Sequence, residues 1–365
     1  MQIVVTGATG FVGSHFAHYA VAAGHRVVGL FRSGRKPDTA QQLADSGVLL
    51  RSANILDRGT LVAAMQGADC VCHFAAAFKE SGVPDDHFHR VNVGGTVNAL
   101  EAAATAGARR FVYCSTAGIY GRRVAGTIDE SAAPQPWNAY ERSKLETERQ
   151  LRSRAPQLGI EYVILRPTAV YGPQDDRLLK MFRLAAKGRF PLLGKGEGRR
   201  HMVYVTDLAD AFLRACTTPA AASKEMIIGG PQVVSLREML EILADAVNRP
   251  TSGPQLPLKP MMLLAAVTED VCSKLGIKPP IYRRRMDFYL NDAAFSSRLA
   301  EEVLGWRPKV SLREGLRNTF MAYCDTGAIG GSRSCGRTAA ASSATFWSVT
   351  QFGQSMYESG WFLLL

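Results

Sequence analysis

The chain has 365 residues, of which 47% are hydrophobic and 21% charged, and it carries a net charge of +11. This is the composition of an ordinary soluble globular protein, long enough for one large domain or two coupled ones, and it argues against a disordered or fibrous chain. The basic residues are scattered and form no stripe with aromatic residues, so we expect a phosphate-bearing small molecule, and not nucleic acid, as the partner.

The number and positions of the cysteines indicate the cellular compartment of the protein. There are seven of them, without the spacing of a metal site, and Cys70, Cys72 and Cys114 fall inside apolar strand patterns. We therefore expect buried free thiols, no bound metal and a reducing, cytoplasmic location. No apolar run reaches the ~18 residues of a membrane helix. Because a strand pattern begins at Gln2, we also expect no signal peptide.

A glycine-rich turn follows the first expected strand, residues 2–5. Gly7, Gly10 and Gly13 have the spacing G-x-x-G-x-x-G, and an apolar helix is expected over residues 14–23. Gly7 and Gly10 allow a tight turn whose backbone can approach a pyrophosphate, and Gly13 lets the helix pack closely on the strand. The helix N-terminus offers free N–H groups to phosphates. The pattern predicts a dinucleotide site.

The second expected strand, residues 26–31, is followed by basic residues. A chain that binds NAD normally carries Asp or Glu near this strand's end, but here Arg32 comes first, with Arg35 behind it. An arginine can pair with a 2′-phosphate, which favours NADP over NAD. A solvated basic loop is the alternative interpretation.

Strands and helices alternate as far as residue 165. Further strands are expected at 48–51, 69–74, 110–114 and 162–165, with helices at 61–67 and 91–106 between them. This alternation predicts an α/β fold with a doubly wound parallel sheet of the Rossmann type. The small residues Ala75 and Ala76, directly after a strand, would let a flat ligand lie on the backbone.

A proton-transfer site is expected between residues 115 and 144. Ser115 and Thr116 end a buried strand, and Asn138 is suited to cap a helix on which Tyr140 and Lys144 share a face. A lysine beside a phenol lowers the phenol's pKa from ~10 toward the range in which a general acid/base works. A Thr116 hydroxyl could hold the substrate oxygen.

The composition shifts after residue 173. We predict a dinucleotide-binding domain over residues 1–171 and a smaller substrate-binding domain over residues 172–325, partly interleaved with the first. Within the second we expect an apolar helix at 261–275 and another helix at 292–304. Residues 326–365 are low in complexity at their start and are expected to form a loosely ordered tail.

Together these segments resemble the extended short-chain dehydrogenase/reductases, the NAD-dependent epimerase/dehydratase family, over about residues 1–324. The matching segments are 6–13, 73–76, 92–96, 114–121, 165–173, 204–207, 304–308, and Tyr140 with Ser143 and Lys144. The resemblance implies that Tyr140 is the acid/base and that Lys144 binds the nicotinamide ribose. It also implies that Thr116 hydrogen-bonds the substrate oxygen, with Ser115 nearby.

The cofactor implied is NAD(P). Asn54 stands where the family usually carries an Asp that meets the adenine, so that contact is altered. The predicted cofactor contacts are Gly7, Thr9, Gly10, Phe11, Val12, Gly13, Arg32, Asn54, Ile55, Ala75, Ala76, Asn92, Tyr140, Lys144 and Pro167.

The predicted substrate contacts are Thr116, Ala169 and Arg200. Dehydratases of the family carry an Asp-Glu pair after the threonine, where this chain has Ala117 and Gly118, so elimination is not expected. Many sugar-nucleotide epimerases carry Asn at the place of Ala169, and its absence here argues against a sugar-nucleotide substrate. Arg200 stands where the family binds the diphosphate, which argues in favour of a sugar-nucleotide substrate.

We therefore expect an NAD(P)-dependent oxidoreductase that transfers hydride at a secondary alcohol or ketone carbon of a nucleotide sugar, as an epimerase or a reductase. One alternative is a dehydrogenase or ketoreductase of an apolar alcohol, because residues 165–173 also resemble the 3β-hydroxysteroid dehydrogenase and dihydroflavonol reductase branch. Another is a non-catalytic NADP-sensing scaffold. A homodimer is compatible with each of these interpretations.

Overall fold

The computed structural model describes residues 1–32, 34, 36–78, 83–188, 190, 192–249, 253–274, 277 and 289–329. The chain divides into two compact units. The first consists of Met1–Val170, Arg200–Val233 and Asp292–Ser311, and the second of Tyr171–Arg199, Val234–Asn291 and Leu312–Leu365.

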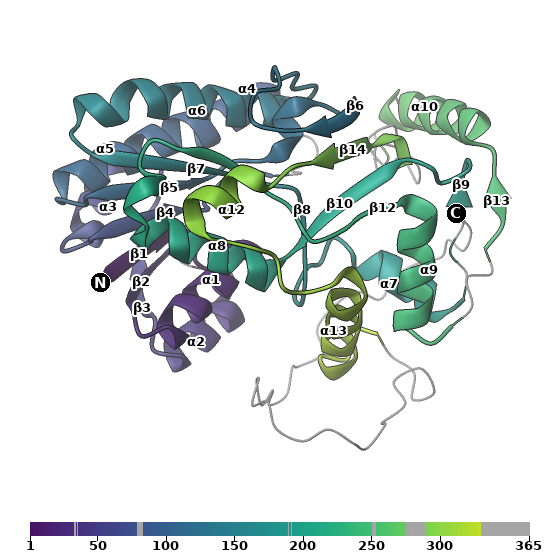
Figure 1. The fold of residues 1–365 in the computed structure, drawn as a ribbon, viewed down its shortest axis with the longest axis horizontal. Helices are drawn as coiled ribbons and strands as arrows, with labels where there is room; N and C mark the ends of the chain where they lie inside the picture. The colour runs from purple at the N-terminus through teal and green to yellow at the C-terminus, as the bar shows by residue number, and fades with distance from the viewer. Residues whose placement is uncertain are drawn as a thin grey trace. The chain divides into compact units, whose positions relative to one another are not determined.

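A seven-stranded sheet forms the centre of the first unit, in the order β11-β7-β5-β4-β1-β2-β3 (Figure 1). All of its neighbouring strands pair in parallel, which confirms the predicted doubly wound sheet. The strands are β1 (Gln2–Thr6), β2 (Arg26–Phe31), β3 (Leu49–Ser52), β4 (Cys70–His73), β5 (Arg110–Cys114), β7 (Glu161–Pro167) and β11 (Glu225–Ile228). Most are apolar throughout because both faces of a parallel sheet are covered.

Helices cover both faces of this sheet (Figure 1). Helices α1 and α8 pack on one face, where the rings of Phe16 and Phe212 lie 5.9 Å apart, and α3, α5 and α6 pack on the other. The helices of this unit are α1 (Phe11–Ala22), α2 (Pro37–Asp45), α3 (Arg58–Met65), α4 (Asp85–Phe88), η1 (His89–Gly94), α5 (Gly95–Thr105), η2 (Ala117–Tyr120), α6 (Ala139–Gln157), α8 (Val205–Thr217), η3 (Pro219–Ala221) and α12 (Arg298–Leu304). This arrangement leaves the loops after β1, β4, β5 and β7 along one edge of the sheet.

A pair of strands outside the central sheet differs from what the sequence predicted. Strand β6 (Arg123–Ile128) pairs in parallel with β14 (Asp292–Phe295). The expected helix at 292–304 is therefore wrong at its start, and only α12 is helical. The two strands are joined by backbone hydrogen bonds such as Ser296 N to Ile128 O, 2.8 Å. Their pairing depends on a partner far away in the sequence, so the local pattern does not show it.

Three short strands, β8 (Ala169–Tyr171), β10 (Arg199–Tyr204) and β12 (Val233–Ser235), form a sheet in the order β12-β10-β8. The chain passes from one unit to the other within each of them.

The second unit is mainly helical. In its core Phe182 stacks on Phe320, with 6.4 Å between the ring centroids, and the Tyr323 hydroxyl donates to the Asp175 carbonyl at 2.6 Å. Its elements are α7 (Leu179–Ala186), the strand pair β9 (Leu192–Leu193) and β13 (Gln255–Leu256), α9 (Leu236–Ala246), α10 (Leu258–Lys274) and α13 (Leu312–Asp325). Helix α10 accounts for the apolar helix expected at 261–275, except for Leu275, which lies outside the described residues.

The predicted tail is described only as far as Ile329. That residue is buried, and its N–H donates to the Tyr323 carbonyl at 3.1 Å. Residues 330–365, the rest of the predicted tail, lie outside the described residues. Among the helices that are described, none has both the length and the apolar character needed to cross a membrane.

Candidate active site

The glycine turn between β1 and α1 has no room for a Cβ at Gly7 or Gly13. Gly7 has φ +68°, and a Cβ there would lie 2.8 Å from the Ala75 N. A Cβ on Gly13 would lie 2.3 Å from the Gly7 carbonyl oxygen. Gly10 is the N-cap of α1, and no side chain caps this helix. A glycine-rich turn leading into a helix N-terminus that no side chain caps is the arrangement that binds a pyrophosphate.

The loop after β4 is tied to the helix that carries Tyr140. The Asn92 Oδ1 accepts from the Ala77 N at 2.7 Å, and its Nδ2 donates to the Ser143 Oγ at 2.8 Å. Asn92 is buried, and these protein groups occupy its amide. Its predicted contact with the cofactor stays a prediction, while the structure gives it the task of holding the Ala75–Ala77 backbone beside α6.

His73, at the end of β4, links the sheet to the helices. Its Nδ1 lies 2.9 Å from the Thr6 Oγ1 and its Nε2 lies 3.0 Å from the Thr96 Oγ1. Burial, with a smaller effect from the Lys144 charge, lowers the pKa of His73 to about 3. The ring is therefore neutral near pH 7 and serves as a hydrogen-bonding strut. Sequence reasoning gave it no such role.

Tyr140 and Lys144 lie one turn apart on α6, as the sequence predicts. Asn138 caps the helix by accepting from the Glu141 N at 2.8 Å. The Lys144 Nζ lies 5.8 Å from the centroid of the Tyr140 ring and donates to the Cys114 carbonyl at 2.7 Å. Burial lowers the pKa of Lys144 to about 8, against the opposing effects of Cys114 and Glu148. The lysine is thus mostly a cation at pH 7 and loses its proton as the pH rises through about 8.

The two hydroxyls at the end of β5 have different surroundings. Thr116 is half-buried, and its Oγ1 accepts from the Gly118 N at 3.0 Å, so its proton can be donated to a substrate oxygen. Ser115 is buried, and its Oγ donates to the Glu148 Oε1 at 2.6 Å. The structure thus directs the Ser115 hydroxyl toward an ion network behind Thr116.

That network joins α6 to β7 and β11. Arg166 donates to both oxygens of Glu148, at 3.0 and 2.6 Å, and to the Tyr120 hydroxyl at 2.8 Å. Arg152 also pairs with Glu148, at 3.0 Å, and Glu225 accepts from both arginines. Sequence reasoning missed Glu148, although its position four residues after Lys144 is a signal that could have found it.

The other predicted cofactor residues follow the carboxyl ends of neighbouring strands. Thr9, Phe11 and Val12 lie in the turn after β1 and the first turn of α1; Arg32 follows β2 and is exposed; Asn54 and Ile55 follow β3; Ala76 follows β4; and Pro167 ends β7. The Asn54 Oδ1 accepts from the Leu56 N at 3.1 Å. Arg35 lies outside the described residues.

The predicted substrate residues are Ala169, exposed at the start of β8, and Arg200, buried in β10. Between Pro167 and Ala169, Thr168 is buried and its Oγ1 has no hydrogen-bond partner among the residues described. This hydroxyl is a further group that a ligand could satisfy, since a buried polar atom without a partner is costly. The position of Thr168 between two predicted contact residues is the sequence signal that could have identified it.

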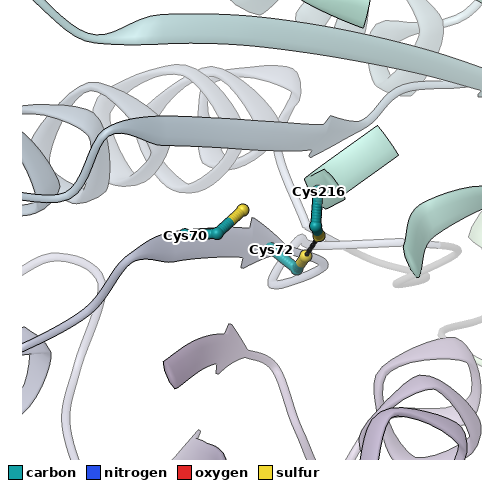
Figure 2. Close-up of side chains that lie close together, drawn as sticks. All are labelled: Cys70, Cys72 and Cys216. Carbon is teal, nitrogen blue, oxygen red and sulfur yellow. Dashed lines mark hydrogen bonds between the residues drawn. The ribbon is translucent and has the colours of Figure 1, made fainter. Parts of the chain in front are cut away.

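Three thiols meet in the core between β4 and α8 (Figure 2). The sulfur atoms of Cys70, Cys72 and Cys216 lie within 4.8 Å of one another, and those of Cys72 and Cys216 are 3.2 Å apart. All three side chains are fully buried, as expected for Cys70 and Cys72, whereas Cys114 is only partly so. Such a cluster could surround one soft cation. The expected absence of a metal stays a prediction.

We expect these three thiols to resist iodoacetamide in the folded protein, because alkylation needs an exposed thiolate. Peptide mass spectrometry should find Cys70, Cys72 and Cys216 unlabelled under native conditions and fully labelled after unfolding in guanidinium. Labelling of Cys216 in the native protein would show instead that the last turn of α8 opens by itself.

Comparison with known proteins shows the family of the chain. Residues 3–229 match the NAD dependent epimerase/dehydratase family, and the chain belongs to that family. It is therefore an NAD(P)-dependent enzyme with a Rossmann fold, as the sequence predicted.

Individual relatives share most of its length. A UDP-glucose 4-epimerase of Mycolicibacterium smegmatis is 31% identical over 87% of this chain and 97% of its own. A 2-alkyl-3-oxoalkanoate reductase of Stenotrophomonas maltophilia is 28% identical over 87% of this chain and 98% of its own. The structure of a UDP-glucose 4-epimerase of Thermus thermophilus in complex with NAD is 26% identical, covers 89% of this chain and 99% of its own, and has a TM-score of 0.70.

Proposed function

We propose that the chain transfers hydride at a secondary alcohol or ketone carbon, with Tyr140 as the acid/base. The observation that carries the proposal is that Lys144, whose Nζ lies 5.8 Å from the Tyr140 ring centroid, donates to the Cys114 carbonyl at the end of β5, two residues before Thr116. The same unit holds a glycine turn with no room for a Cβ at Gly7 or Gly13. The bound NAD(P) would supply a nicotinamide C4 that accepts or returns the hydride. The turn and the N-terminus of α1 would hold its pyrophosphate.

Each side chain then has one task. The Thr116 hydroxyl donates a hydrogen bond to the substrate oxygen and places it beside Tyr140. The Tyr140 phenolate takes the hydroxyl proton as the carbon loses its hydrogen with the electron pair, and returns that proton in the reverse direction. Lys144 favours the phenolate by its charge and holds the ribose. Ser115, whose hydroxyl is committed to Glu148, supports the end of β5.

The substrate that we propose is a nucleotide sugar, with Arg200 and Ala169 among its contacts. The epimerase relatives and the position of Arg200 support this choice. The test is turnover of UDP-glucose and UDP-galactose by the purified enzyme, with and without added dinucleotide. Interconversion of the two sugars with no net change in the dinucleotide would indicate an epimerase, whereas conversion of one dinucleotide per substrate turned over would indicate a dehydrogenase or reductase.

A second candidate substrate is an apolar alcohol or ketone. The ring of Phe78 is 38% exposed and lies edge-on to the Tyr140 ring, with 4.8 Å between the centroids. An exposed aromatic ring beside the acid/base favours an apolar neighbour. Activity on medium-chain or steroid ketones, with none on UDP-sugars, would select this candidate over the first.

We propose NADP as the preferred dinucleotide. Arg32 is exposed directly after β2, and none of the described residues at 32, 34 and 36 is acidic. Arg32→Ala should lose about tenfold in NADP affinity, the lower end of the range for a charge-assisted pair because solvent screens it. Dissociation constants for both dinucleotides check this, with NAD as the internal control. Equal or tighter NAD binding by the parent, unchanged in the variant, would mean that Arg32 points to solvent.

We further propose a cytoplasmic location and a homodimer. The division into a dinucleotide-binding domain at 1–171 and a substrate-binding domain at 172–325 also stays our proposal. Light scattering of the purified chain would test the oligomeric state directly.

A further inference from the structure

Helix α6 carries a third functional side chain on the face of Tyr140 and Lys144. Glu148 follows at the same four-residue interval, and its side chain has no exposed surface. Lys144 is almost as deeply buried, yet among the described residues no carboxylate lies within ion-pairing distance of its Nζ. A buried lysine without a paired acid depends on the surrounding charges to keep its proton.

Glu148 reaches the lysine's environment through the backbone of β5. Its Oε1 accepts from the Ser115 Oγ at 2.6 Å, and the carbonyl of the preceding residue, Cys114, accepts from the Lys144 Nζ at 2.7 Å. The helix and the strand end are therefore joined twice, once through each of the two charged side chains. The carboxylate of Glu148 also forms ion pairs with Arg152 and Arg166, and Arg166 donates to both of its oxygens.

We propose that Glu148 is a positioning residue that keeps Lys144 charged and keeps its ammonium on the Cys114 carbonyl. This rests on the proposed function, in which Lys144 holds the dinucleotide. Glu148 itself touches neither the cofactor nor the substrate. It acts on the site through Ser115 and through its negative charge.

The other groups around Lys144 do not replace that charge. The ionisable groups that face it directly or through Glu148 are His73 on β4, Tyr113 and Cys114 on β5, Tyr140 and Glu148 on α6, Arg152 on α6, Arg166 on β7 and Glu225 on β11. Burial keeps the pKa of His73 low and raises the pKa of the Tyr113 phenol and of the Cys114 thiol, so these three are neutral near pH 7. Glu225 is engaged by the two arginines.

The Glu148 charge is expected to raise the pKa of Lys144. Burial lowers the pKa of Lys144 to about 8, and Cys114 and Glu148 act in the opposite direction. Because the Cys114 thiol is neutral near pH 7, the Glu148 carboxylate is the opposing charge that is present there. Without the carboxylate charge, the pKa of Lys144 falls further, so the ammonium is lost at a lower pH. A property that needs the ammonium must then fail at a lower pH as well.

The experiment measures dinucleotide affinity of the full chain as a function of pH, from about pH 6 to about pH 10. We expect the parent to lose affinity as the pH rises through about 8. Glu148→Gln should move this loss about one pH unit lower, the scale of one unit charge acting from the next turn of the helix at intermediate dielectric. Glu148→Asp, which keeps the charge, should restore the parent's profile. Glu146→Gln, on the same helix and paired with Arg149 at the surface, is the matched control.

Charge balance decides the choice of a second variant. Glu148→Gln leaves two arginines with one acid, and this excess charge can prevent folding. In that case Glu148→Gln is combined with Arg152→Gln, which leaves the neutral Arg166–Glu225 pair. Arg152→Gln alone is its control. An alkaline loss of affinity that does not move when the Glu148 charge is removed overturns the proposal. So does a loss that persists in Lys144→Met, because another group must then cause it.

The readout is binding, so it separates this proposal from the proposed function. A parent that binds dinucleotide with the expected profile but turns over no alcohol or ketone contradicts the function and leaves the role of Glu148 supported.

Discussion

Replacing Tyr140 by phenylalanine is expected to reduce turnover by at least about 100-fold while leaving dinucleotide affinity near that of the parent, because positioned acid/base groups typically contribute 10²–10⁴-fold. The change removes one hydroxyl and keeps the ring, so the edge-on contact with Phe78 remains. Thr116 and Lys144 would still bind and orient the ligands, but no group would take the hydroxyl proton.

Steady-state turnover and a fluorescence titration with the reduced dinucleotide measure the two quantities separately. Tyr162→Phe, on β7 and half-buried, is the matched control and should leave both unchanged. Near-normal turnover of Tyr140→Phe would remove the assignment of the acid/base. A parallel loss of cofactor affinity would show that the hydroxyl has a binding role that the proposal does not include.

The second large effect is expected for Gly7→Ala. The new methyl would lie 2.8 Å from the Ala75 N, at φ +68°, so both the backbone conformation and the contact with the loop after β4 are unfavourable. A left-handed conformation costs an alanine about 1–2 kcal/mol, and the clash adds further strain. We expect a lower free energy of unfolding and a loss of dinucleotide affinity of at least about tenfold, because the turn must open at the place where we propose that the pyrophosphate binds.

Gly24→Ala separates the two causes. Gly24 has φ +84°, but a Cβ there meets nothing within 4 Å, so it carries the conformational cost without the clash. Urea unfolding of both variants and a dinucleotide titration provide the comparison. If the two variants lose the same stability and both bind the dinucleotide normally, the Ala75 backbone yields to the methyl and the turn is not as rigid as its contacts indicate.

The sequence predicted the parts of the site that depend on short-range patterns. The glycine turn, the Asn138 cap and the shared face of Tyr140 and Lys144 each lie within a few residues, where backbone geometry alone links residue type to position. The parallel sheet followed from the alternation of apolar strands with helices. These are the features that one segment specifies without its neighbours.

Other features depend on partners far apart in the sequence. The sequence placed Ser115 beside the substrate, but its hydroxyl turns to Glu148, 33 residues later. Cys216 joins Cys72 across 144 residues, and β14 replaces the start of an expected helix because β6 is available to pair with it. Such contacts are set by tertiary packing, which overrides local preference and has no local signature.

The course of the chain between the two units has a consequence for any attempt to take the protein apart. Strand β11 and helix α8 belong to the first unit but come after residue 199, and β14 returns to it after residue 291. A fragment that stops at residue 171 would keep the glycine turn, Tyr140 and Lys144. It would, however, expose the edge of β7 and the apolar face that α8 covers, and unpaired strand edges invite aggregation. The first unit is therefore not encoded by one continuous segment, and exchanging the second unit between relatives would require several grafted segments and not a single crossover point.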